Sequence, residues 1–292
     1  MSPATRPAPF VLLASRMRAD EKRLLDAFER RGMECEYVDS RATWSLLHRD
    51  RPEQRLVLNR EIGHARALYA ARALEAAGAT VVNTAAATDV CGDKWQTSVA
   101  LRAHGIATPR TALGLTPEAA LEALEAIGYP AVVKPLVGSW GRLVTLVPDR
   151  RTAETVMEYV AALPSPQSHI VYAQELVAHP GRDIRAVVVG GELLGTVYRR
   201  GDGWRTNVAR GATTEAFEPS AEIEKLALAA AEAVGADIAG VDLIEDADGR
   251  PLVLEVNDGV EFSGFQRAVG ERTDVAGRIA EFLMTRAQSC FE

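Results

Sequence analysis

Two short apolar segments, Gly240-Val-Asp-Leu-Ile244 and Leu252-Val-Leu-Glu-Val-Asn257, decide the fold of this chain of 292 residues. Between them stands Asp248-Gly249, a pair favoured in two-residue hairpin turns. Apolar runs of this length on either side of such a turn are typical of two antiparallel strands. The sequence therefore predicts a β-hairpin near the C-terminal end.

Three polar side chains of this hairpin are expected to meet on one face. The predicted turn places Asp242 directly across from Glu255, and Asn257 follows two residues later on the same face. Carboxylates that face each other repel, so a cation is expected between them, and oxygen ligands of this kind suit Mg²⁺. Apolar neighbours favour a core position for these strands, although an edge hairpin with solvent-facing carboxylates is the alternative.

Composition excludes several classes of protein. Hydrophobic residues make up 47% and charged residues 25%, which is ordinary for a globular protein, and no apolar run is long enough to span a membrane. The formal net charge of -7 argues against non-specific nucleic-acid binding. The wide spacing of Cys35, Cys91 and Cys290 fits neither a disulfide framework nor a zinc site, so a reducing cytoplasm is predicted.

The pattern along the chain indicates three lobes. Strands and helices alternate over the first 82 residues, which predicts a small parallel sheet flanked by helices, without the G-x-G-x-x-G turn of a dinucleotide site. Later strands are separated by turns and a proline-marked linker. The predicted fold class is α/β and α+β, with lobes over residues 1–90, 91–172 and 173–292.

Lysine is rare in this chain, because only four of the 33 basic residues are lysine. Lys134 ends an apolar strand and precedes a loop that contains Gly138, Ser139 and Gly141. Glycines let backbone N–H groups approach a phosphate, and a lysine supplies a point charge, although the sequence lacks a Walker A motif. A hairpin with a solvated lysine is the alternative.

Lys94 is expected in the first turn of a helix that starts near Asp93. A cation is unfavourable there, because the helix dipole is positive at that end. The position suggests an anionic partner, and a surface lysine beside Asp93 is the alternative.

Arginines gather in one loop system, although the protein as a whole is acidic. They occur in Gly181-Arg-Asp-Ile-Arg185, at Arg199-Arg200, and at Arg205 and Arg210, with Asn207 between the last two. Guanidinium groups suit carboxylates and phosphates, so a local anionic substrate is expected, unless the segment is a solvated loop.

Taken in order, these motifs resemble the RimK-like branch of the ATP-grasp ligases across essentially the whole chain. Within that branch they resemble the LysX and ArgX ligases, which act on an amino-group carrier protein in lysine and arginine biosynthesis. The resemblance implies an ATP-grasp fold with an N-terminal, Rossmann-like pre-ATP-grasp domain. It is carried by Val81–Thr84, Cys91–Leu101, Val133–Leu143, Pro180–Arg185 and Glu255–Asn257.

The resemblance also implies roles for individual residues. ATP is expected to lie between the central and C-terminal lobes, with Mg²⁺ or Mn²⁺, as two ions. The expected phosphate contacts are Lys94, Lys134 and the loop of Gly138, Ser139, Trp140, Gly141 and Arg142. Gln174, Glu175 and Leu176 are expected at the adenine and Asp183 near the ribose. Asp242, Glu255 and Asn257 match the metal ligands, and Arg185, Arg199, Asn207 and Arg210 match residues near the phosphoryl group.

The implied reaction is an ADP-forming ligation. ATP phosphorylates a carboxylate, and an amine then attacks the acyl phosphate. The expected partners are a small acidic carrier protein, which offers the γ-carboxylate of a C-terminal glutamate, and an amino acid of the 2-aminoadipate or glutamate type. A glutamate ligase for a peptide or cofactor tail, and a non-catalytic ATP-binding regulator, are the alternatives. A homo-oligomer, dimer or tetramer, is implied by resemblance alone.

Two segments depart from the family pattern. Arg60–Arg66 replaces a loop that is usually rich in serine, and Asp258–Arg267 begins differently from the lysine-type ligases. The incoming amino acid is expected to bind in these regions. His64 is either a ligand for that substrate or a surface histidine at a helix start.

Overall fold

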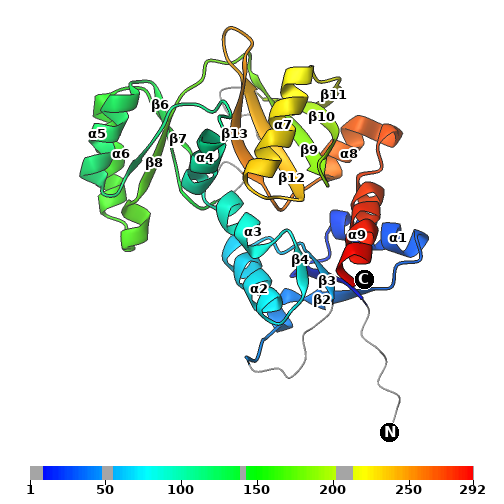
Figure 1. The fold of residues 1–292 in the computed structure, drawn as a ribbon. Helices are drawn as coiled ribbons and strands as arrows, with labels where there is room; N and C mark the ends of the chain where they lie inside the picture. The colour runs from blue at the N-terminus through cyan, green and yellow to red at the C-terminus, as the bar shows by residue number, and fades with distance from the viewer. Residues whose placement is uncertain (1–8, 48–54, 139–142, 202–212, 292) are drawn as a thin grey trace.

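The computed structural model describes residues 9–47, 55–138, 143–201 and 213–291, which form three sheets with helices around them (Figure 1). The first sheet is parallel, as predicted, with strand order β2-β1-β3-β4. Helix α1 covers one face and helix α2 the other. The elements are β1 Phe10–Ala14, α1 Ala19–Arg30, β2 Cys35–Asp39, the 3-10 turn Ser40–Ala42, β3 Leu56–Asn59, α2 His64–Ala76 and β4 Thr80–Val82.

The central sheet is antiparallel, with order β5-β8-β6-β7, and helices α5 and α6 pack on it around a core of its own. The Thr116 hydroxyl accepts a hydrogen bond from the backbone N–H of Ala119 and so caps the start of α5. Gly128, with φ of 89°, ends that helix. The elements are β5 Thr111–Gly114, α5 Pro117–Ile127, β6 Ala131–Lys134, β7 Thr145–Val147, α6 Arg150–Ala161, a 3-10 turn Pro166–His169 and β8 Val171–Glu175.

The C-terminal sheet is antiparallel, with order β11-β10-β9-β12-β13. Alternate residues of β9 face opposite sides, so Ile184 and Ala186 pack toward α7, whereas Val187 and Val189 pack toward the N-terminal sheet. The strands are β9 Arg182–Val189, β10 Glu192–Arg200, β11 Thr213–Phe217, β12 Ile238–Glu245 and β13 Pro251–Asn257.

The β12–β13 hairpin is present, but its turn differs from the prediction. The loop is wider than Asp248-Gly249, because the N–H of Asp246 donates to the carbonyl of Arg250. That shift alone would move the strands out of the predicted register. A β-bulge between Asp242 and Leu243 restores the register, so that Asp242 does pair with Glu255.

Several helices join the lobes, and the sequence patterns did not reveal all of them. The remaining helices are α3 Ala85–Gly92, α4 Lys94–Ala103, α7 Ala221–Ala233, α8 Ser263–Val269, a 3-10 turn Gly270–Arg272 and α9 Val275–Phe291. Strands β5 and β11 and helices α3, α8 and α9 were missed. Helix α9 lies beside α1 (Figure 1), and α4 packs on the C-terminal sheet through Leu101. The lobe boundaries at residues 90 and 172 stay a prediction.

Asn83 ties the N-terminal sheet to the C-terminal sheet. Its side-chain amide donates to the carbonyl oxygens of Ile238 at 2.7 Å and Asp258 at 3.0 Å, and its Oδ1 accepts from the N–H of Ile238 at 2.9 Å. The Asn83 side chain is 4% exposed, so these bonds are formed away from water. They fix the start of β12 against the end of β4.

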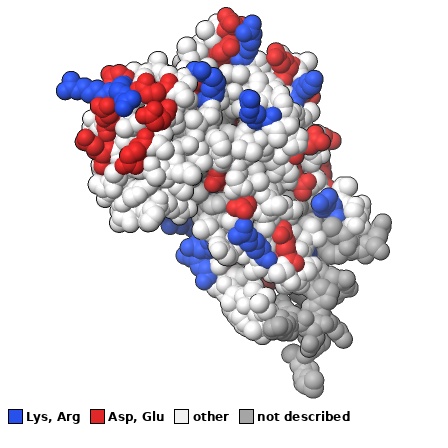
Figure 2. Space-filling view, turned by 60° about the vertical axis from the view of Figure 1, so that its left-hand side comes forward, with Lys and Arg blue, Asp and Glu red and all other residues white. Residues whose placement is uncertain are grey.

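The described surface carries mixed charge. On the face drawn in Figure 2, the described basic side chains are scattered among acidic ones and do not form one extended patch. Within the described ranges, no helix is long and apolar enough to cross a bilayer. Cys35 and Cys91 are free thiols.

Candidate active site

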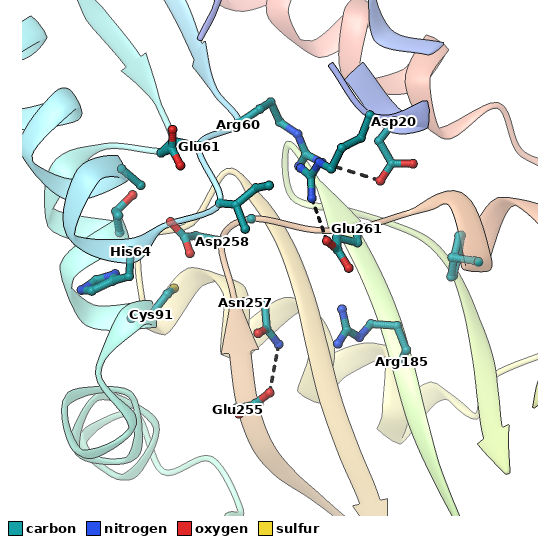
Figure 3. Close-up of a pocket in the computed structure, with 18 of the residues that line it drawn as sticks. Asp20, Arg60, Glu61, His64, Cys91, Arg185, Glu255, Asn257, Asp258 and Glu261 are labelled. Carbon is teal, nitrogen blue, oxygen red and sulfur yellow. Dashed lines mark hydrogen bonds and ion pairs between the residues drawn. The ribbon is translucent and has the colours of Figure 1, made fainter. Parts of the chain in front are cut away.

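A cavity of about 760 Å³ lies where the three parts of the chain meet. The C-terminal sheet contributes Arg185, Arg199, Glu255 and Asn257, and the start of α4 with the loop after β6 contributes Lys94 and Gly138. The N-terminal lobe contributes the loop after β3 (Figure 3). The cavity therefore brings together residues predicted from four separate motifs.

A charged row crosses the C-terminal sheet from strand to strand. Glu255 on β13 pairs with Asp242 on β12, which pairs with Arg185 on β9. Arg185 donates from Nε to Asp242 Oδ1 at 2.5 Å and from Nη2 to Oδ2 at 3.0 Å. Arg199 Nη2 lies 3.2 Å from Asp242 Oδ2. The row therefore takes residues from the four strands β10, β9, β12 and β13.

The two arginines lie on the β9 and β10 side of Asp242, away from Glu255 on β13, and Asp242 is 3% exposed. The cation expected between Asp242 and Glu255 therefore stays a prediction. Burial alone would raise the pKa of Asp242, but the guanidinium groups of Arg185 and Arg199 outweigh it and hold the pKa below its ordinary value. Asp242 is therefore an ionised carboxylate at neutral pH.

Asp183 binds the guanidinium group of Arg199 in this structure. Arg199 donates to both carboxylate oxygens of Asp183, from Nε at 2.6 Å and from Nη2 at 2.7 Å. Burial lowers the pKa of Arg199, but the charges of Asp242 and Asp183 outweigh burial and raise it. Asp183 thus positions Arg199, and its contact with a ribose stays a prediction.

Lys94 begins α4, as the sequence predicted, and its side chain turns into the cavity. Asp93 does not pair with it, because Asp93 caps the helix by accepting from the N–H groups of Trp95 and Gln96. Lys94 Nζ instead donates to the carbonyl of Gly138 at 2.8 Å and lies 3.9 Å from Glu255 Oε2. The interpretation of Lys94 as a surface lysine is therefore wrong.

Lys134 ends β6, also as predicted, and lies within the central sheet. Its Nζ donates to the side-chain oxygen of Gln174 at 2.6 Å, and Gln174 is only 1% exposed. Removal from water lowers the pKa of Lys134 to about 8, with the nearby Lys94 adding to the effect, while Glu255 and Asp242 oppose it. An ammonium with so little compensation is a group that an anionic ligand would stabilise.

Other predicted nucleotide contacts lie partly outside the described residues. Glu175 accepts from the backbone and side chain of Arg110, and the Leu176 N–H donates to the carbonyl of Pro130 at 3.3 Å. Their contact with adenine stays a prediction. Outside the described residues lie Ser139, Trp140, Gly141, Arg142, Asn207 and Arg210.

The predicted metal ligands fit a divalent cation only in part. Asn257 Nδ2 lies 3.4 Å from Glu255 Oε1, so the amide and the carboxylate are adjacent at the cavity wall, and Glu255 is half-buried (Figure 3). Asp242 already binds two arginines through both oxygens. In the described part of the chain, no three His, Cys, Asp or Glu residues form a group that could hold a metal ion. Two carboxylates and one amide are a donor set that suits Mg²⁺. Asp242 can join that set only when Arg185 no longer binds its carboxylate oxygens.

The sequence did not single out Gly240, which makes room for Arg185. A Cβ atom at this position would lie 2.7 Å from Arg185 Nη1. The absence of a side chain at Gly240 therefore leaves room for the Arg185 guanidinium beside Asp242.

Both segments that depart from the family pattern line the same cavity. Arg60, Glu61 and His64 come from one of them, and Asp258 and Glu261 from the other. Figure 3 shows Asp258 on the same side of the view as His64, and Glu261 below Arg60. Burial raises the pKa of Asp258, and the Thr88 hydroxyl with the charges of His64 and Arg60 partly offsets the rise. His64 thus lies at the cavity and at the start of α2.

Two protein-family models match this chain, one over each of two consecutive segments. Residues 91–283 match the model of the RimK-like ATP-grasp domain, and residues 10–90 match the LysX preATP-grasp domain. The chain belongs to the RimK-like ATP-grasp family. Members of this family are ligases, so the chain is an ATP-grasp ligase, and the fold implies that it binds ATP with a divalent cation.

Two relatives show how far the similarity extends. The glutamate–LysW ligase ArgX of Sulfurisphaera tokodaii is 32% identical over 277 residues, which cover 94% of this chain and 97% of ArgX. The α-aminoadipate–LysW ligase LysX of Sulfolobus acidocaldarius is 32% identical over 256 residues, covering 86% and 93%. The chain is thus similar to both over nearly its whole length.

Solved structures agree on the architecture. The RimK domain ATP-grasp protein of Sphaerobacter thermophilus superposes with a TM-score of 0.78 and 31% identity, covering 94% of this chain and 99% of that one. The D-cycloserine synthetase DcsG gives a TM-score of 0.75 at 21% identity, covering 95% and 99%, and so shares the fold.

Proposed function

We propose that this protein is an ADP-forming ligase that joins the α-amino group of an amino acid to the γ-carboxylate of the C-terminal glutamate of a small acidic carrier protein. The observation that carries the proposal is the meeting of Lys94, Arg185, Glu255 and Asn257 at one cavity, in a chain similar to LysW ligases over 94% of its length. The amino acid is of the 2-aminoadipate or glutamate type.

The residues of the site suit an acyl-phosphate mechanism. A carboxylate becomes reactive once it is phosphorylated, and phosphoryl transfer asks the protein mainly for positioning and for neutralisation of charge. Lys94 and Lys134 offer ammonium groups to the phosphates of ATP, and Arg185 and Arg199 lie where the acid and the transferred group meet. Mg²⁺ held by Glu255, Asn257 and Asp242 would neutralise the phosphates when bound.

Arg185 can bind either Asp242 or the acyl phosphate. While it binds Asp242, that carboxylate neutralises its charge. With Asp242, Glu255 and Asn257 holding a divalent cation, Arg185, which lines the cavity, would be available to bind the anionic acyl phosphate. The amine then attacks the carbonyl, and enclosure by the three parts of the chain limits hydrolysis.

The test is a substrate panel with the purified protein, ATP and Mg²⁺. Candidate carriers that end in glutamate are mixed with 2-aminoadipate, glutamate and other amino acids, and ADP and the carrier mass are measured. A mass increase equal to the amino acid minus water, together with ADP, is expected. No increase with any amino acid would remove the carrier protein from the proposal.

A second candidate is a glutamate ligase that acts on a peptide or cofactor tail. It is favoured by the similarity to a protein named probable α-L-glutamate ligase of Vibrio cholerae, 32% identical over 284 residues and 92% of each chain. ADP formation with glutamate and a peptide ending in glutamate, but not with the carrier, would select this function.

A further inference from the structure

Arg60 carries a nitrogen that has no hydrogen-bond partner in the described part of the chain. The residue is only 4% exposed, it lines the cavity, and its Nη2 is buried without a hydrogen bond to any described residue. A buried guanidinium N–H that forms no hydrogen bond is rare and unfavourable in folded proteins. The arrangement therefore indicates a ligand that accepts a hydrogen bond at this point.

The rest of the Arg60 side chain is fixed. Its Nε donates to Glu21 Oε1 at 3.2 Å, and its Cζ lies 5.8 Å from the centroid of the Phe262 ring. Asp20 Oδ2 is 3.7 Å from Nη2, which is too far for a hydrogen bond. That oxygen accepts instead from the N–H of Phe262 at 2.8 Å. Glu21 and the Phe262 ring thus hold Arg60 in place, while the two N–H groups of Nη2 have no hydrogen-bond partner among the described residues.

The chemistry around Arg60 selects the kind of ligand. A guanidinium N–H prefers an anionic oxygen, and the same part of the cavity also holds the carboxylates of Asp258 and Glu261 (Figure 3). Glu261 is already paired with Arg18 at 2.7 Å, and Asp258 lines the same cavity as Arg60. A ligand with an anionic group for Arg60 and a hydrogen-bond donor for the Asp258 carboxyl group suits both side chains. An amino acid carries both, because its carboxylate is anionic and its ammonium group donates hydrogen bonds.

We propose that Arg60 binds a carboxylate group of the incoming amino acid, with Asp258 facing its ammonium group. This inference rests on the proposed function, because it assumes that an amino acid is the amine substrate. It places that amino acid between the N-terminal lobe and the residues Glu255 and Asn257. The two segments that depart from the family pattern then form one subsite for the amino acid. Its carboxylate can be the α-carboxylate or one in the side chain.

The first experiment separates amino-acid binding from activation of the carrier. Arg60→Lys keeps the charge but removes the planar fork. It should raise KM for the amino acid on the order of 10- to 100-fold, with a much smaller effect on kcat. Arg72→Lys is the matched control, because Arg72 is exposed on α2 and binds Asp89 outside the cavity. Its KM should equal that of the unchanged protein.

Hydroxylamine distinguishes failure of the subsite from failure of the proposed function. It attacks the acyl phosphate of the carrier without needing a carboxylate, releasing phosphate and forming a hydroxamate. If the unchanged protein forms no carrier hydroxamate with ATP, the proposed function fails and the subsite with it. If hydroxamate forms but Arg60→Lys leaves KM for the amino acid unchanged, only the Arg60 inference is overturned.

The second experiment uses the unchanged protein and therefore does not depend on the folding of a variant. The α-amide and the side-chain amide of the substrate amino acid are compared with the free acid by KM. The amide that removes the carboxylate bound by Arg60 should raise KM about tenfold or more, and so identifies which carboxylate Arg60 holds. Equal KM values for both amides and the free acid would overturn the inference.

Discussion

Replacing Lys134 with methionine should stabilise the protein at neutral pH while weakening nucleotide binding. The pKa of Lys134 is lowered to about 8 from 10.5, mainly because the ammonium is removed from water. A pKa of about 8 in place of 10.5 corresponds to about 3 kcal/mol of destabilisation at pH 7, which methionine would remove. Loss of the 2.6 Å bond to the buried Gln174 offsets about 1–3 kcal/mol of that gain.

The pH dependence provides the sharper test, because the lost hydrogen bond affects both pH values alike. Below about pH 8, Lys134 is charged in the folded and the unfolded protein, and the folded state carries the whole penalty. Between pH 8 and 10.5 the unfolded chain binds the proton and the folded one releases it, so the unchanged protein gains stability as pH rises. The advantage of methionine should shrink by about 2–3 kcal/mol between pH 7 and pH 10.

The assay is urea unfolding followed by circular dichroism at pH 7 and pH 10, without nucleotide. Lys225→Met is the control, because Lys225 is exposed on α7, and its effect should be small at both pH values. A stability difference for Lys134→Met that is the same at both pH values would refute the reasoning. In calorimetric titrations at pH 7, the variant should also bind ATP on the order of 10- to 100-fold more weakly.

Three further changes test other parts of the structure. Glu255→Ala should lower the rate of ADP formation by at least about 100-fold, and an unchanged rate would show that Glu255 does not hold a metal. Gly240→Ala puts a Cβ 2.7 Å from Arg185 Nη1 and should slow ADP formation on the order of tenfold, whereas equal kinetics would mean that Arg185 tolerates displacement. Asn83→Ala leaves the backbone of Ile238 unpaired and should lower the free energy of unfolding by about 2–4 kcal/mol in urea, and a change within about 0.5 kcal/mol would contradict the link.

The sequence predicted local relations better than distant ones. The pairing of Asp242 with Glu255 followed from the pleat of two neighbouring strands, although a bulge and a wider turn replaced the simple hairpin. Lys94 at the start of α4 and Lys134 at the end of β6 followed from helix and strand patterns.

The partner of Asp242 could not be read in the same way. Arg185 precedes it by 57 residues, and the two meet only because β12 lies beside β9 in the sheet. Strand order depends on packing of whole elements, which a hydrophobic pattern does not encode. The unpartnered nitrogen of Arg60 was equally hidden, because it depends on Glu21 and Phe262 from two other segments.

The arrangement of the cores has a consequence for motion during turnover. The N-terminal and C-terminal sheets share one apolar core, to which Leu12, Val187 and Ile279 belong, whereas the central sheet packs around separate residues such as Leu124 and Met157. Units with independent cores can rotate relative to each other without exposing much buried surface. The central sheet can therefore rotate as one rigid unit when nucleotide binds or leaves. Arg60 and Asp258 belong to the unit formed by the N-terminal and C-terminal sheets, so the distance between them does not change in this rotation. A bound amino acid can then remain in place while ADP dissociates.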